Sequence, residues 1–180
     1  MSAAQCEAKI RRLDWAGLRR LWTSIAAGRT KGWASGKAFE YLVLRAFELS
    51  GATVRWPYAV NLDGAVVEQI DGAIHISGLS CLVESKDTID PVNIEPIAKL
   101  RNQLLRRHSS AMGLLFSKSG FTSPAITLAH FLAPQSILLW SGEEVSALLD
   151  VEDFSSALLS KYRAHVEDGV PDYDVRAAAL

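Results

Sequence analysis

The sequence predicts an α/β domain in which a mixed central β-sheet carries helices on both faces. Apolar residues recur at helical spacing up to about residue 50, and from residue 52 to 86 the period falls to two. Further along, short apolar runs alternate with helical stretches. The middle region therefore predicts an antiparallel meander, and the last region predicts buried parallel strands joined by helices. With 180 residues, 49% of them hydrophobic and 22% charged, the chain is long enough for one such domain.

Two helices are expected before the first strand. Residues 8–27 carry an apolar stripe at helical spacing, and residues 28–36 break it. A second helix is expected from Ser35, a capping residue, to Ser50, with Gly51 as its stop. Glu40 lies at the edge of the apolar stripe of this second helix. Its carboxylate is therefore expected to point toward whatever the helix packs against.

Three strand-like segments follow. They comprise residues 53–60, which Pro57 interrupts, residues 66–77 and residues 80–86, with turn signals at Asp63-Gly64 and Gly78-Leu79. Along the last segment, alternation turns the carboxylate of Glu84 and the amine of Lys86 toward the same face. Asp71 lies in the middle segment, and all three charged residues stand beside apolar runs that ought to be buried. Their desolvation requires a compensating partner, and a divalent metal ion is the simplest one.

The remaining elements complete a single domain over residues 1–166. They are a helix over residues 93–108, opened by Pro91, the strands 111–116 and 136–140, and the helices 123–132, 143–149 and 153–165. We divide the domain into an N-terminal helix (1–30), a core (31–149) and a C-terminal helix (150–166). Residues 167–180 are expected to form a tail: the acidic stretch 167–174 is predicted to fray, and residues 176–180 resemble a vector-derived remnant.

Charge and cysteine content narrow the functional classes. The formal net charge is −1, so any attraction to phosphate must come from a local basic patch. Cys6 and Cys81 are far apart and fit a reducing compartment better than a disulfide framework or a zinc site. The N-terminus has no apolar stretch typical of a signal peptide, and no later segment approaches the length of a membrane span. The chain is therefore expected to be cytoplasmic.

The charged residues supply what hydrolysis of a phosphodiester requires, which is an attacking hydroxide, a cation near the phosphoryl oxygens and support for the leaving oxygen. Asp71, Glu84 and the main-chain carbonyl of Ser85 are oxygen ligands of the kind that Mg2+ prefers, with Mn2+ as a substitute. Lys86 can orient the attacking water, stabilise charge in the transition state or help to remove a proton. Glu40 can contact the metal through water, bind a second ion or orient Lys86.

The same residues resemble a known motif. Asp71, followed by Glu84-Ser85-Lys86 on the next strand, is similar to the PD-(D/E)xK nuclease motif, and a preceding helix that carries Glu40 is also the arrangement of that superfamily. Within it, the chain most resembles the catalytic domain of Mrr-type restriction endonucleases. The supporting segments, which fall within about residues 31–149, are 36–40, 69–72, 83–86 and 121–125. The resemblance implies a restriction-endonuclease-like sandwich, dependence on Mg2+ and cleavage of DNA in a restriction, defence or repair setting.

Two departures from the Mrr-type pattern leave the substrate open. Ile70 precedes Asp71 where the motif has proline, a change that is common in the superfamily. Glu84 stands where many Mrr-type members have glutamine, and this acidic form is shared with archaeal Holliday-junction resolvases and other nucleases. A repair nuclease or resolvase that acts on branched DNA or RNA is therefore one alternative. A non-catalytic nuclease fold used for binding is another, although none of the expected site residues is missing.

Five basic residues are candidate contacts for DNA phosphates: Lys99, Arg101, Arg106, Arg107 and Lys118. A solvated helix face explains the first four equally well. The sequence shows no separate DNA-reading module such as a helix-turn-helix or a zinc finger. Cutting both strands then requires two copies of the site, so that we expect a homodimer or a partner protein that supplies specificity.

Other residues with chemical potential are assigned to structure. His75 lies on the predicted strand of Asp71, and a hydrogen-bonded sheet histidine is the favoured interpretation over a site residue. Asp87 is expected to cap or turn the chain after Lys86. The five tryptophans stand at no regular interval and are expected to serve core packing or a dimer contact.

Overall fold

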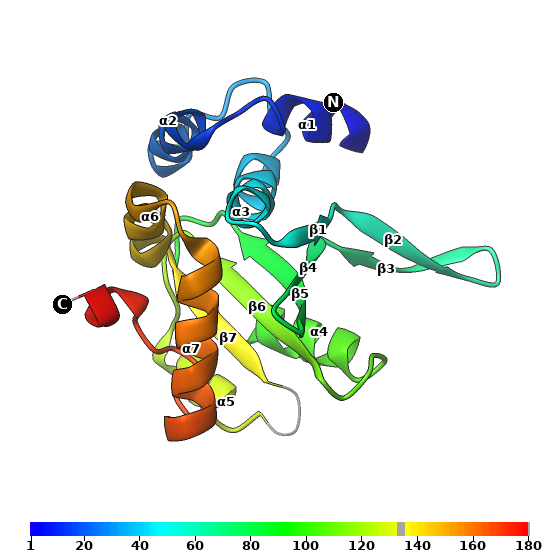
Figure 1. Ribbon diagram of the computed structural model, residues 1–180. Coiled ribbons are helices and arrows are strands. Elements are labelled where there is room, and N and C mark those ends of the chain that lie inside the picture. The colour runs from blue at the N-terminus through cyan, green and yellow to red at the C-terminus, as the bar shows by residue number, and fades with distance from the viewer. Residues whose placement is uncertain (133–135, 180) are drawn as a thin grey trace.

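The centre of the molecule is a five-stranded mixed sheet, from which a two-stranded hairpin projects (Figure 1). This computed structural model describes residues 1–132 and 136–179, so that Leu180, the last residue of the expected tail, lies outside the described part. The strands are β1 (Thr53–Arg55), β2 (Tyr58–Leu62), β3 (Ala65–Ile70), β4 (Gly72–Ile76), β5 (Leu79–Lys86), β6 (Ala111–Ser117) and β7 (Ile137–Ser141). The sheet has the order β1-β4-β5-β6-β7, and β2 and β3 form the hairpin.

Strand pairing in the sheet changes from antiparallel to parallel at β5. β4 pairs with β1 and β5 in antiparallel register, whereas β6 pairs with β5 and β7 in parallel register. The parallel pairs require crossover connections, which the helices α4 (Ile94–Leu104) and α5 (Ser123–His130) supply. The mixed sheet, the antiparallel meander and the buried parallel strands are confirmed.

Helices cover both faces of the sheet, as predicted. One face carries α1 (Ala3–Ile10), α2 (Trp15–Ala26), α3 (Lys37–Leu49), α6 (Gly142–Val151) and α7 (Phe154–Asp168), and the other carries α4 and α5. Side chains of β5 alternate between the layers, because Cys81 and Val83 join the first core and Leu82 joins the second. Within residues 1–132 and 136–179, the helices are too short or too polar to cross a membrane.

Aromatic side chains fill the core on the α3 side of the sheet. Trp140 stacks on Phe116 with ring centroids 5.3 Å apart, and Trp56 stacks on Tyr41 at 5.7 Å. The other tryptophans, Trp15, Trp22 and Trp33, also contact aromatic rings. Burial of such a side chain stabilises the fold by roughly 1.5–3 kcal/mol. Their role in packing, one of the two roles expected from the sequence, is therefore confirmed.

The single helix predicted over residues 8–27 is two helices in the structure. α1 ends at Ile10 and α2 begins at Trp15. The side chain of Asp14 accepts a hydrogen bond from the backbone N–H of Gly17 at 2.8 Å and so caps α2. Both helices contact α3, so the apolar stripe continues across the break. Periodicity alone therefore hides the interruption, whereas the capping residue marks it.

The predicted strands 53–60 and 66–77 are each divided between the sheet and the hairpin. β1 and β2 are separated at Pro57, and β3 and β4 are separated at Asp71. β3 pairs with β2, whereas β4 pairs with β1 and β5. Gly72 allows the chain to approach α3 closely, since a Cβ atom there would lie 2.5 Å from a side-chain carbon of Leu44. Asp71 thus lies where the hairpin leaves the sheet.

The outer edge of β7 is closed by polar contacts. The backbone N–H of Leu139 donates to the carbonyl oxygen of Pro171 at 2.9 Å, and that of Ser141 donates to the carboxylate of Glu144 at 2.8 Å. The fully buried ammonium group of Lys161 lies 2.5 Å from the carbonyl oxygen of Leu139 and 2.7 Å from Glu144. The backbone N–H and the carbonyl oxygen of Leu139 therefore both have hydrogen-bond partners at the edge of the sheet.

The C-terminal segment is docked on the fold. Pro171 is buried, and so is Val175, the first residue of the 3-10 helix η1 (Val175–Ala179). The backbone N–H of Val175 donates to Glu144 at 3.3 Å. The expectation that residues 167–174 form a frayed tail is therefore wrong, because α7 extends to Asp168 and the following residues pack beside β7.

Candidate active site

Segments that are distant in sequence place the candidate acids near one end of β5, close enough for their charges to interact. Glu40 lies on α3, Asp71 lies at the junction of β3 and β4, and Glu84 lies near the end of β5. The carboxylate of Asp71 accepts a hydrogen bond from the backbone N–H of Ser85 at 2.9 Å. This contact joins the two halves of the motif recognised in the sequence.

Glu84 is enclosed between two lysine side chains. Its own side chain is 1% exposed, and one carboxylate oxygen lies 2.7 Å from Nζ of Lys86. Nζ of Lys99, on α4, lies 2.8 Å from both carboxylate oxygens. Glu84 and Lys86 thus point to the same face of β5, as alternation predicts. Two ammonium groups compensate the charge of this buried carboxylate.

Glu40 contacts Lys37, one turn earlier on the same helix. Oε2 of Glu40 lies 2.6 Å from Nζ of Lys37, and the buried Oε1 has no hydrogen-bond partner in the described part of the chain. Burial, and next the charge of Asp71, raises the pKa of Glu40 to about 7. Among the three roles considered for Glu40, orientation of Lys86 is not seen, because Glu84 holds Lys86 instead.

The charges at the site act on one another. Burial, and next the negative charge of Glu84, raises the pKa of Asp71 above its ordinary value. Burial, the largest single effect, lowers the pKa of Lys86, but the hydrogen bond to Glu84 and the negative charges of Glu84 and Asp71 together raise it above its ordinary value. A protonated Lys86 is suited to donate a hydrogen bond. Removal of a proton, one of the three roles considered for it, is not favoured by this environment.

The donor chemistry of the site fits a hard divalent cation. Asp71 and Glu84 offer carboxylate oxygens, and Oε1 of Glu40 is buried without a hydrogen-bond partner among the described residues. Within residues 1–132 and 136–179, no group of three or more acidic, histidine or cysteine side chains is already gathered around one point. The oxygens of Glu84 face lysine ammonium groups at the places where a cation would bind.

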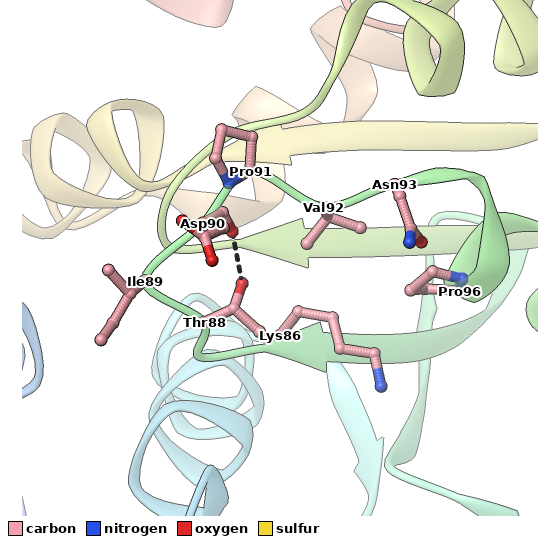
Figure 2. Close-up of a pocket in the computed structure, with 8 residues that line it drawn as sticks. All are labelled: Lys86, Thr88, Ile89, Asp90, Pro91, Val92, Asn93 and Pro96. Carbon is pink, nitrogen blue, oxygen red and sulfur yellow. Dashed lines mark hydrogen bonds between the residues drawn. The ribbon is translucent and has the colours of Figure 1, made fainter.

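Two openings reach this site. A cavity of about 400 Å³ lies beside Lys86 and is lined mainly by the loop that leads from β5 to α4 (Figure 2). Within that loop, the hydroxyl group of Thr88 donates to the carbonyl oxygen of Asp90 at 2.8 Å. A second cavity, of about 200 Å³, is lined by Asp71, Lys37 and the start of the hairpin. One cavity therefore borders Lys86 and the other borders Asp71.

A comparison with known protein families finds the restriction endonuclease family Mrr_cat over residues 33–149. The chain belongs to this family. The match confirms the resemblance to Mrr-type catalytic domains that the motif indicated. It includes Glu40, Asp71, Glu84 and Lys86, while α1 and α2 precede it.

Solved structures support the fold of this Mrr-family chain. It is similar to "Protein of Unknown Function AF1548" with a TM-score of 0.50 and 17% identity, over 70% of this chain and 76% of that one. It is also similar to "DNA modification-dependent restriction endonuclease AspBHI" with a TM-score of 0.50 and 14% identity, over 84% of this chain. The aligned region is 38% of the length of AspBHI. These similarities confirm the restriction-endonuclease-like sandwich.

A search of curated protein sequences found no match.

Most of the basic residues that were candidate DNA contacts in this Mrr-family domain have acidic partners. Lys99 contacts Glu84, and Lys118 forms an ion pair with Asp87. Arg106 and Arg107 both contact the buried carboxylate of Glu68 on the hairpin. Arg101 is exposed and, unlike Lys99, Arg106 and Arg107, forms no ion pair within the described residues. The predicted basic face is thus largely neutralised, with Arg101 as the exposed exception.

Two lysines at the site of the Mrr-family domain were not assigned there from the sequence. Lys37 precedes Glu40 at the i, i+3 spacing of a helical ion pair, which is a signal that the sequence contains. Lys99 reaches Glu84 from another element, and no local spacing reveals such a contact. His75 lies outside this group, since its Nδ1 is 3.0 Å from the hydroxyl oxygen of Ser80. That contact agrees with the favoured interpretation of a hydrogen-bonded sheet histidine.

Proposed function

We propose that this domain is a divalent-metal-dependent endonuclease that hydrolyses phosphodiester bonds of DNA in restriction or defence. Its site residues are Glu40, Asp71, Glu84 and Lys86, with Mg2+ as cofactor and Mn2+ as a substitute, within a catalytic core over residues 31–149. The observation that carries the proposal is the hydrogen bond from the N–H of Ser85 to Asp71. It holds the acid at the hairpin junction against the strand that presents Glu84 and Lys86.

The residues divide the chemistry among them. When bound, a divalent cation supplies positive charge for the phosphoryl oxygens and makes the attacking water more acidic. Asp71, Glu84 and the carbonyl oxygen of Ser85 would hold this cation. Lys86, protonated beside Glu84, donates to a phosphoryl oxygen and stabilises the charge that grows in the transition state. Glu40, with a pKa of about 7, is suited to accept a proton near neutral pH.

The test is cleavage of plasmid DNA by the purified chain with Mg2+ or Mn2+, compared with EDTA. The Asp71→Asn variant keeps an acceptor for the N–H of Ser85 but loses a charge, so that it is expected to fold and to lose at least about 100-fold in rate. Asp63→Asn, at the exposed turn of the hairpin, is the matched control and retains activity. Equal cleavage by the Asp71→Asn variant, or no cleavage with either metal, rejects the proposal.

Glu84 keeps a second class of substrate in consideration. Many Mrr-type members have glutamine at this position, and the acid is shared with nucleases that act on branched DNA or RNA. A panel of linear, methylated, flapped and four-way DNA, with matched RNA, separates the two classes. Preference for flapped or four-way substrates over linear DNA favours a repair nuclease or resolvase.

We also infer that cleavage of both DNA strands involves two copies of the domain or a partner that supplies specificity. One set of the four site residues lies in the matched region, and a duplex has two strands of opposite polarity. Light scattering of the chain with and without a DNA duplex tests this point. A single copy on a duplex that is cut in both strands contradicts it.

A further inference from the structure

Lys99 occupies the carboxylate oxygens that a cation at Glu84 requires. Its ammonium group lies 2.8 Å from Oε1 and 2.8 Å from Oε2 of Glu84, while Lys86 contacts Oε1 at 2.7 Å. Burial of an ionised carboxylate is costly unless opposite charge compensates it. Glu84 is buried, so these two ammonium groups are what compensates its charge wherever no metal ion is bound.

The two lysines differ in how firmly the fold holds them. Lys86 lies two residues from Glu84 on the same strand, and the strand itself keeps the two side chains on one face. Lys99 extends from α4, and 45% of its side chain remains exposed to solvent. Lys99 is therefore the partner that can leave Glu84 without unfolding any element.

On the basis of the proposed function, we propose that Lys99 is a positioning residue that holds Glu84 in the metal-free protein and competes with the divalent cation for it. Binding of the cation to Glu84 releases the ammonium group toward solvent. The released ammonium group then binds a DNA phosphate. Binding of DNA and binding of the metal ion therefore strengthen each other through Lys99. The role of Lys99 as a phosphate contact, expected from the sequence, follows the release from Glu84.

The experiment measures Mn2+ affinity of the full chain without DNA, from the electron paramagnetic resonance signal of free Mn2+. Lys99→Met removes the ammonium group but keeps the length of the side chain, and it is expected to bind Mn2+ about fivefold more tightly than the unaltered chain. Arg101→Met removes the same charge from the same helix at a residue that is not among the partners of Glu84. It is expected to change the affinity less than twofold, since solvent screens exposed charges.

A second arm adds a phosphorothioate DNA duplex that resists cleavage. DNA is expected to raise the Mn2+ affinity of the unaltered chain about fivefold and that of Lys99→Met less than twofold, because the variant has no ammonium group to release. Lys99→Gln, which keeps a donor for Glu84, serves in both arms if Lys99→Met does not fold, as judged by circular dichroism.

The outcomes separate this inference from the proposed function. If the unaltered chain binds Mn2+ and Lys99→Met binds it no more tightly than Arg101→Met does, competition by Lys99 is rejected while the metal site stands. An equal effect of DNA on both proteins rejects the coupling. If neither the unaltered chain nor Lys99→Met binds Mn2+, the metal site and the role of Lys99 fail together. Binding by Lys99→Met alone supports the inference strongly.

Discussion

The carboxylate of Asp71 accepts a hydrogen bond from the backbone N–H of Ser85, with 2.9 Å between the two atoms. Asp71 is the residue between β3 and β4, so this contact fixes the point at which the hairpin leaves the sheet. The position of the acid therefore depends on how the chain passes from the hairpin into β4. The chain packs against α3 at Gly72, the residue that follows Asp71.

A Gly72→Ala substitution is expected to disturb both stability and the site. The added Cβ atom would lie 2.5 Å and 2.8 Å from the methyl carbons of Leu44 and 3.0 Å from the carbonyl oxygen of Arg55. Such overpacking costs roughly 1–3 kcal/mol, because α3 or β4 must shift. Thermal unfolding and DNA cleavage measure the two effects. An unchanged unfolding temperature and an unchanged cleavage rate would show that α3 shifts to admit the methyl group without moving Asp71.

Replacement of Lys86 by alanine is expected to lower turnover much more than metal affinity. Its ammonium group acts on charge that grows in the transition state, so we expect a loss of about 100-fold in rate and a change below about threefold in Mn2+ affinity. Single-turnover cleavage and Mn2+ binding check this, with exposed Lys31→Ala as the control. Parallel loss of rate and metal binding would make Lys86 a structural residue.

Stability of the metal-free protein is expected to depend on Glu40 and pH. The pKa of Glu40 is raised from 4.5 to about 7, chiefly by burial, so the folded protein keeps this proton at a pH where the unfolded chain loses it. The stabilisation that this proton gives the folded protein is complete below pH 4.5 and is lost as the pH rises to about 7. At pH 8, Glu40→Gln should therefore be more stable than the unaltered chain by on the order of 2 kcal/mol.

Denaturant unfolding in EDTA at pH 5 and pH 8 measures this difference. Glu95→Gln, which removes an exposed acid, is the matched control and should show no gain at either pH. A gain for Glu40→Gln that is equal at both values of pH would contradict the assigned cause, since the effect would then not follow ionisation of Glu40.

The hairpin is expected to loosen when Glu68 is replaced by glutamine. Glu68 is buried on β3, and its carboxylate contacts Arg106 and Arg107 beyond the end of α4. Loss of charge-assisted hydrogen bonds costs roughly 1.5–3 kcal/mol, and these hydrogen bonds are among the contacts that hold the hairpin to the domain. Amide hydrogen exchange should accelerate in β2 and β3 but not in β6. Uniform acceleration would instead indicate global destabilisation, and Asp63→Asn is the control.

The sequence predicts the layers and the motif because both depend on patterns of residues that are close together in the sequence. Alternation along residues 80–86 places Glu84 and Lys86 on one face, and the structure joins their side chains at 2.7 Å. Short apolar runs likewise predict β6 and β7 as buried parallel strands. Charge beside an apolar run and the family motif both indicate Asp71, but no local pattern indicates its contact with Ser85.

Other features depend on contacts between distant segments. Residues 66–77 alternate like one strand, yet β3 and β4 have different partners, and alternation is the same in either case. The charges of Arg106 and Arg107 resemble a basic face until the folded hairpin brings Glu68 to them. The contact of Lys99 with Glu84 is likewise formed only when α4 packs on β5.

The closed edge of β7 restricts how copies of the domain can associate. A free edge strand accepts a further strand from a neighbour, but the N–H groups of Leu139 and Ser141 already have acceptors within the chain. Strand addition or exchange at this edge would first have to displace Pro171 and the charged pair of Lys161 and Glu144. A continuous intermolecular sheet through β7 is therefore disfavoured.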